Sequence, residues 1–193
     1  RSVTVDLRSD EGRELVTGLI TACGVLVDNV VGRRWMANDA LVAKRPDLIH
    51  VRVQGYPDGR PAVDYTVNAE VGVPQITGSE DSAAPVNHVL PAWDLVAGLS
   101  VSTAVLAALY DRDRTGRGAY VELALADVAL AGVANLGWLS EAAERGHDRP
   151  RHGNHVYGSF GVDFACSDGQ RVMVVALTPG QWTALTSVTG TKA

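Results

Sequence analysis

Residues 1–55 alternate short strand-like runs with helix-like segments, and this alternation limits the possible folds more than any other feature. Residues 2–7 alternate apolar and polar side chains, which is the period of a half-buried strand, while 25–27 and 48–53 are short apolar runs. A helical repeat capped by Ser9 separates the first two runs, and a short helix over 38–43 separates the last two. Such alternation predicts βαβ units and an α/β fold with a parallel sheet.

The middle of the chain predicts two loops and two long helices. Residues 56–92 are rich in proline and glycine and are expected to form a long loop, and 145–161 a second one. Residues 94–110 are apolar nearly all round, which predicts a buried helix. A strand over 120–125 is followed by a predicted helix over 127–144. Gly132 and Gly137 lie inside this predicted helix, where glycine is less favourable than alanine by about 1 kcal/mol, so we expect close packing against a neighbour to compensate for this cost.

The pattern changes to a β-hairpin after residue 161. Residues 162–166 and 170–177 flank Ser167-Asp168-Gly169, and Thr178-Pro179 opens a further helix. We therefore expect a large domain over 1–148, a linker over 149–161 and the start of a smaller α+β domain over 162–193. Because the chain starts without Met on a strand-like run and stops soon after a helix begins, we expect it to be truncated at both ends.

Composition excludes several classes of protein. The net charge of -5, with both signs interspersed, argues against a nucleic-acid partner. The two cysteines are far apart, which makes a disulfide framework unlikely and indicates a reducing cytoplasm. No metal is expected, because the five histidines lack metal-ligand spacing. No apolar run approaches the length needed to cross a bilayer, so no membrane partner is expected.

Asp94 is the best candidate for a catalytic nucleophile. It lies at the start of the long apolar helix, where an aspartate is also a good N-cap, and taken alone the cap is the simpler interpretation. Both roles are compatible, since a helix N-terminus stabilises a carboxylate and a nearby anion. A carboxylate attacks a thioester only if it is positioned, partly desolvated and close to oxyanion donors.

Two further regions carry candidate binding residues. Ligands of parallel sheets bind outside the carboxyl ends of the strands, which are occupied here by Asn29 and the turn at 54–56. Arg33 and Arg34 follow and suit a phosphate, although surface charges are the simpler interpretation. The glycine-rich segment 153–161 lets backbone approach a ligand closely, or is an ordinary linker; it lacks P-loop spacing.

Taken together, these segments resemble the class III CoA-transferases, a family that includes formyl-CoA and carnitine-CoA transferases and α-methylacyl-CoA racemase. The order and spacing of the matching segments carry the resemblance. They are Arg1-Ser2-Val3, Asp6-Leu7, Glu11-Gly12-Arg13, Val25-Leu26-Val27-Asp28-Asn29, Asp64-Tyr65, Asp94-Leu95-Val96-Ala97-Gly98-Leu99, Leu106-Ala107-Ala108-Leu109 and Arg114-Thr115-Gly116-Arg117-Gly118.

The resemblance implies a Rossmann-like open sheet with helices on both faces, a smaller second domain and an interlocked homodimer. It implies an acyl-CoA thioester as substrate, with no bound cofactor, and Asp94 as the residue that forms a mixed anhydride. Five residues match the CoA-binding region: Asn29, Val30, Arg33, Arg34 and Tyr65. The candidates for the substrate site and its lid are His88, Arg151, His152, Gly153, Asn154, Tyr157 and Gly158.

Single positions separate the branches of the family. A racemase carries a histidine and a glutamate where this chain has Val63 and Thr178, neither of which transfers protons at neutral pH. The segments 85–94 and 148–154 resemble the 2-methylfumaryl-CoA (mesaconyl-CoA) isomerase branch, which moves CoA between the two carboxyl groups of one acid. Intermolecular transfer to a separate acid such as succinate and an inactive fragment are the alternatives.

Overall fold

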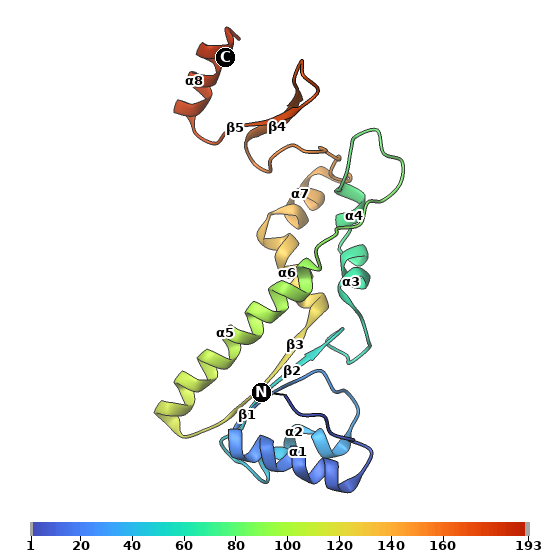
Figure 1. Ribbon diagram of the computed structural model, residues 1–193, viewed down its shortest axis with the longest axis vertical. Coiled ribbons are helices and arrows are strands. Elements are labelled where there is room, and N and C mark those ends of the chain that lie inside the picture. Colours follow the sequence, from blue (N-terminus) through green and yellow to red (C-terminus); the bar gives the residue numbers. More distant parts are fainter. Residues whose placement is uncertain (1, 192–193) are drawn as a thin grey trace.

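The computed structural model describes residues 2–191, and a three-stranded parallel sheet lies in the half of the molecule that also contains the N-terminal helices (Figure 1). Strand β1 (Val25–Asp28) pairs with β2 (Ile49–Gln54), and β2 pairs with β3 (Ala119–Ala124). The order β1-β2-β3 brings the carboxyl ends of all three strands to one edge. The predicted parallel α/β sheet is confirmed.

Helices cover both faces of this sheet. Helix α1 (Asp10–Cys23), the 3-10 turn η1 (Arg34–Met36) and α2 (Asn38–Val42) pack around Ile20, Met36, Leu41 and Leu48. His50 faces α2, where its ring meets Asn38. Because side chains alternate along a strand, Ile49 and Val51 point to the opposite face, along which the long helix α5 (Ala92–Thr115) runs.

The N-terminal segment differs from its prediction. Residues 2–6 form no strand; Asp6 instead accepts hydrogen bonds from the backbone and guanidinium of Arg8. Its alternating pattern had no neighbouring strand to pair with among residues 2–191. The predicted cap of α1 is confirmed, since the Ser9 hydroxyl accepts from Gly12 N at 3.0 Å, and α1 ends at Gly24 in the left-handed conformation.

Two other element predictions were wrong. The expected loop 56–92 contains α3 (Asp64–Glu70) and the single turn α4 (Val73–Ile76). The expected helix 127–144 is two helices, α6 (Leu125–Asn135) and α7 (Trp138–Arg145), because Gly137 adopts φ 78° and ends the helical path between them. Such a backbone conformation suits glycine and stops an α-helix.

The predicted close packing at a helical glycine holds for Gly132. A Cβ built on Gly132 would lie 2.6 Å from the Trp93 ring, so only glycine lets α6 approach the first turn of α5. We expect Gly132→Ala to lower the free energy of unfolding by about 1–3 kcal/mol through overpacking. Gly18→Ala, in the interior of α1, is the matched control. Apart from its chain neighbours and the backbone of its own helix, no atom lies within 4 Å of a Cβ built on Gly18, so the free energy of unfolding is expected to rise by about 0.5–1 kcal/mol. Urea unfolding measures both. Equal effects of the two substitutions would contradict the packing argument.

Helix α5 is apolar but not buried. Only Ala97 and Ala108 are buried, while Leu99 and Leu106 are 71% and 67% exposed. An apolar composition predicts that a helix is buried but does not show which part of the protein covers it. Within residues 2–191 little covers the side of α5 that carries Leu99 and Leu106. By length and composition α5 could also cross a membrane, contrary to the sequence expectation. It instead packs along β2, β3, α3 and α6 of the α/β fold.

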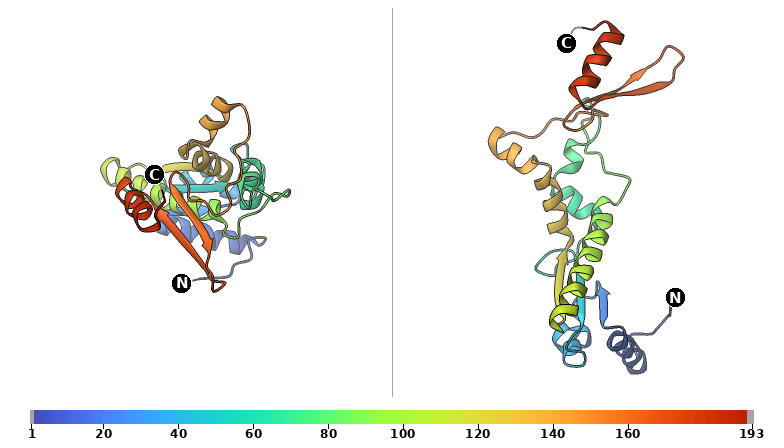
Figure 2. Two further views of the ribbon diagram at one scale, coloured as in Figure 1. Left: turned by 90° about the horizontal axis from the view of Figure 1, so that it is seen from above. Right: turned by 90° about the vertical axis from the view of Figure 1, so that its left-hand side faces the viewer.

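The C-terminal elements confirm the predicted hairpin and helix. Strands β4 (Phe160–Ala165) and β5 (Arg171–Ala176) pair antiparallel around Gly169, whose φ is 82°. Thr178 caps α8 (Pro179–Thr189) in a capping box with Gln181. Figure 2 shows the hairpin and α8 at one end of an elongated chain, with α1 and α2 at the other.

Candidate active site

Asp94 is the third residue of α5, and its side chain is exposed. The N-cap position belongs to Pro91, so the interpretation of Asp94 as the cap of its own helix was wrong. The Asp94 carboxylate is therefore not occupied by capping bonds. It remains available for other chemistry.

The cap is supplied by Asp64, from the start of α3. The Asp64 carboxylate, 2% exposed, accepts hydrogen bonds from Trp93 N at 2.7 Å and Asp94 N at 3.2 Å. Its second oxygen lies 2.5 Å from His88 Nε2, which donates to it. Two amides that would otherwise face an anion at the helix terminus are thus satisfied within the protein. The first turn of α5 holds Asp94 in place, but these two amides do not serve as oxyanion donors.

A second contact from α3 fixes the same turn. The Trp93 indole donates to the Asn68 side chain at 3.0 Å, and Asn68 donates to Asn87 at 3.0 Å. Asn68 is fully buried. The turn that carries Asp94 is therefore held by Asp64, by Asn68 and by the packing of Trp93 on Gly132. Sequence reasoning missed Asp64 and Asn68 as positioning residues because it placed them in a loop.

Asp94 borders a cavity of about 480 Å³ at the carboxyl edge of the sheet. Each strand of the parallel sheet contributes to its wall at or just beyond its carboxyl end: Asn29 follows β1, Gln54 ends β2, and Leu125 follows β3. The remaining wall residues are Val31, Val53, Gly55, Gly59, Arg60, Pro61, Ala62 and Val63. Asn29 and the 54–55 turn, which are expected to flank a ligand site, therefore border the same cavity as Asp94.

Gly55 makes the floor of this cavity possible. A Cβ at Gly55 would lie 2.1 Å from Ala62 N and 2.6 Å from Arg60 O, so the 59–62 loop can fold over the end of β2 only beside a glycine. Tyr56 N donates to Arg60 O at 3.1 Å and closes this loop. Arg60, which sequence reasoning did not single out, is thereby brought to the cavity wall. Its position depends on a turn that no local pattern marks as a binding site.

Comparison with known proteins now defines the family. The model of CoA-transferase family III matches residues 1–193. The chain belongs to this family. It is 46% identical over 194 residues to 2-methylfumaryl-CoA isomerase of Chloroflexus aurantiacus, covering 98% of this chain and 47% of that protein. It is 30% identical over 200 residues to succinyl-CoA:mesaconate CoA-transferase of Haloarcula hispanica, covering 96% of this chain and 49% of that protein.

Solved structures of similar proteins share the fold of this chain. A CAIB/BAIF family protein from Brucella suis superposes with a TM-score of 0.78 at 26% identity, covering 98% of this chain and 52% of the other. A hypothetical protein from Mycobacterium tuberculosis gives 0.79 at 26% identity, with 99% and 54% covered. This family III chain therefore spans about half the length of the relatives it matches.

The predicted CoA-binding residues of the family III chain do not all meet at the cavity. Asn29 lines it, whereas Val30 packs against the hydrophobic cluster beneath α1 and α2. Arg33 and Arg34 are exposed beyond the cavity wall, and Tyr65 is half exposed with its ring 5.7 Å from that of His88. His88 is engaged by Asp64, so it is less free to bind a substrate carboxylate than expected.

The predicted lid residues lie elsewhere in the chain. Arg151 donates to Gln75 O at 2.6 Å and to Ser82 O, and Gly153 N donates to Gly78 O at 2.9 Å. His152, Gly153 and Asn154 line a separate hollow with residues 77–81, and Tyr157 and Gly158 line another. Within residues 2–191 none of them borders the Asp94 cavity. In the arrangement described this loop does not enclose Asp94, because hydrogen bonds from the Arg151 side chain and from Gly153 N hold it to the 75–82 segment.

Proposed function

We propose that the full-length protein transfers CoA from an acyl-CoA thioester to a carboxylate through an anhydride at Asp94. The observation that carries this proposal is the shared cavity of Asp94 and Asn29 at the carboxyl ends of all three strands. In a parallel sheet this edge is the usual place for a ligand. Membership of a CoA-transferase family supplies the substrate class.

The proposed reaction uses the Asp94 carboxylate as a nucleophile. An oxygen of Asp94 attacks the thioester carbonyl; a C–O bond forms, the C–S bond breaks and CoA leaves as a thiolate. The thiolate then attacks the aspartyl carbonyl, which gives an aspartyl-CoA thioester and frees the acyl carboxylate. The acceptor carboxylate attacks this thioester, which forms a second anhydride with Asp94 and again releases CoA as a thiolate. The thiolate then attacks the acceptor carbonyl of this anhydride, so that the product thioester forms and the Asp94 carboxylate is regenerated. No proton transfer from carbon is required.

Val63 supports transfer over racemisation. It lies on the wall of the Asp94 cavity, where its side chain can neither accept nor donate a proton. Thr178, at the other discriminating position, caps α8 with its hydroxyl. The structure thus offers neither side chain as an acid or base. We retain CoA transfer as the function and Asp94 as its nucleophile.

We further propose that the transfer is intramolecular, between two carboxyl groups of one acid. The 46% identity to a 2-methylfumaryl-CoA isomerase favours this over the intermolecular reaction named in the 30% identical relative. Full-length protein incubated with 2-methylfumaryl-CoA and no added acid is expected to form the isomeric thioester, detected by liquid chromatography and mass spectrometry. If the isomer forms only after succinate or another acid is added, the intermolecular alternative is correct.

Several features of the site depend on the remainder of the full-length protein. We propose that Asn29 contacts the CoA thioester, and that Arg33, Arg34 and Arg60 provide cationic charge for its phosphates or for the second substrate carboxylate. We also propose a homodimer in the cytoplasm, a division into domains near residues 149–161, and closure of the exposed Asp94 by protein beyond the segment described. Such closure would supply the partial desolvation and the oxyanion donors that Asp94 requires.

A further inference from the structure

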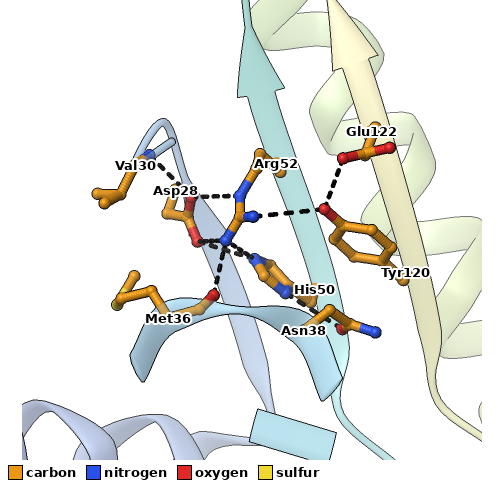
Figure 3. Close-up of polar contacts among 8 residues, drawn as sticks. All are labelled: Asp28, Val30, Met36, Asn38, His50, Arg52, Tyr120 and Glu122. Carbon is orange, nitrogen blue, oxygen red and sulfur yellow. Dashed lines mark hydrogen bonds and ion pairs between the residues drawn. The ribbon is translucent and has the colours of Figure 1, made fainter. Parts of the chain in front are cut away.

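A buried polar cluster joins β1 and β2 to the loop that leads from β1 to α2 (Figure 3). Asp28, at the end of β1, and His50 and Arg52, on β2, have side chains that are 6%, 0% and 12% exposed. His50 Nε2 donates to Asp28 Oδ2 at 2.8 Å, and Arg52 Nε donates to Asp28 Oδ1 at 3.1 Å. We call these three residues the clamp.

The clamp holds both ends of the 29–37 loop. At the start of the loop, Val30 N donates to Asp28 Oδ1 at 2.9 Å. Near its end, Arg52 Nη2 donates to Met36 O at 2.7 Å. His50 Nδ1 lies 3.2 Å from the Asn38 side chain, at the first residue of α2. The side chains of three residues on β1 and β2 therefore fix the position of the loop where it leaves β1 and where it enters α2.

The sheet itself does not require this arrangement. Apolar residues would cover the same face of β2, and a buried ion pair offers little net stability over them because both charges are desolvated. Burial raises the pKa of the Asp28 carboxyl, but the hydrogen bonds from His50 and Arg52 outweigh it and hold that pKa below its ordinary value. The carboxylate is thus kept charged and able to accept from Val30 N. What the clamp provides is a defined loop geometry.

We propose that Asp28, His50 and Arg52 are positioning residues for CoA-thioester binding, because they fix the loop that carries Asn29 and Val31 to the wall of the Asp94 cavity. The inference rests on the proposed function. It concerns residues that touch no substrate and act only through the loop. Their removal is therefore expected to weaken CoA binding more than it slows the transfer chemistry.

The test uses two variants of the full-length protein, Asp28→Asn and Arg52→Lys. The second is included in case the buried Asp28→Asn change prevents folding. It keeps the positive charge but loses the forked geometry of the guanidinium. We expect KM for 2-methylfumaryl-CoA and Kd for free CoA, measured by calorimetry, to rise about tenfold or more, with kcat changed by less than about threefold. Hydrogen exchange of the 29–37 peptide is expected to quicken in both variants.

Arg112→Lys is the matched control. Arg112 is also largely buried and donates to backbone carbonyls, Gly24 O at 2.8 Å and Asp47 O at 3.2 Å, but at the opposite edge of the sheet. It should leave KM, Kd and exchange of the loop unchanged. Unchanged KM and Kd in a folded clamp variant, or an equal rise in Arg112→Lys, would overturn the proposal. A wild type that neither transfers nor binds CoA would instead refute the proposed function itself.

Discussion

Full-length protein carrying Asp94→Ala is expected to lose CoA transfer by about 10³-fold or more, because no other described side chain at the cavity wall offers a carboxylate for anhydride formation. Asp94 is exposed at the third position of α5 and does not cap its helix. Its removal should therefore leave the unfolding midpoint nearly unchanged. Initial rates of thioester exchange and a thermal melt measure the two effects separately.

Two variants control for the loss of activity. Asp94→Asn keeps the shape of the side chain but is a far weaker nucleophile, and should be as inactive as the alanine variant. Asp113→Ala removes another carboxylate from the far end of the same helix and should retain activity. Activity that survives in Asp94→Asn would exclude the anhydride at this residue.

Asp64→Ala is expected to have the largest effect on stability, lowering the free energy of unfolding by about 3 kcal/mol. The buried Asp64 carboxylate accepts from Trp93 N, Asp94 N and His88 Nε2, and alanine leaves all three donors without their partner. Activity should fall as well, since the first turn of α5 loses the cap that positions Asp94. Urea unfolding of the full-length protein measures the first effect, and kcat the second.

Asp58→Ala is the control for this second prediction. The Asp58 carboxylate also accepts from an arginine, Arg60, but the two side chains are 56% and 67% exposed. Exposed pairs contribute little, so a change within about 0.5 kcal/mol is expected. If Asp64→Ala and Asp58→Ala lower the free energy of unfolding by the same amount, Asp64 does not hold the first turn of α5 as the structure indicates.

Local patterns were enough to predict the sheet and the C-terminal hairpin. The apolar runs at 25–27 and 48–53 are short, bounded by turn residues and separated by a capped helix, so each signal agrees with its neighbours. The run at 2–7 has the same alternation but no strand beside it, and remains irregular. The helix at 64–70 was missed because it stands among prolines and glycines that indicate a loop.

The candidate site was predictable only in part. Asn29 and the 54–55 turn were expected at strand ends, since the geometry of parallel sheets requires it. Asp94 is positioned by hydrogen bonds from Trp93 N and Asp94 N to Asp64, and these partners are separated in sequence by 29 and 30 positions. No local sequence pattern predicts contacts over such a separation. The family resemblance predicts Asp94 as the nucleophile, whereas the cap from α3 and the clamp on β2 became visible only in the fold.

The most direct test is to trap the proposed anhydride. Full-length protein would be mixed with 2-methylfumaryl-CoA and hydroxylamine, digested and examined by mass spectrometry of the peptide that contains Asp94. An aspartyl hydroxamate at Asp94, formed only when the acyl-CoA is present and absent from Asp94→Asn, is the expected result. A protein that turns over 2-methylfumaryl-CoA under the same conditions while the Asp94 peptide stays unmodified, or is modified at another carboxylate, would contradict Asp94 as the nucleophile.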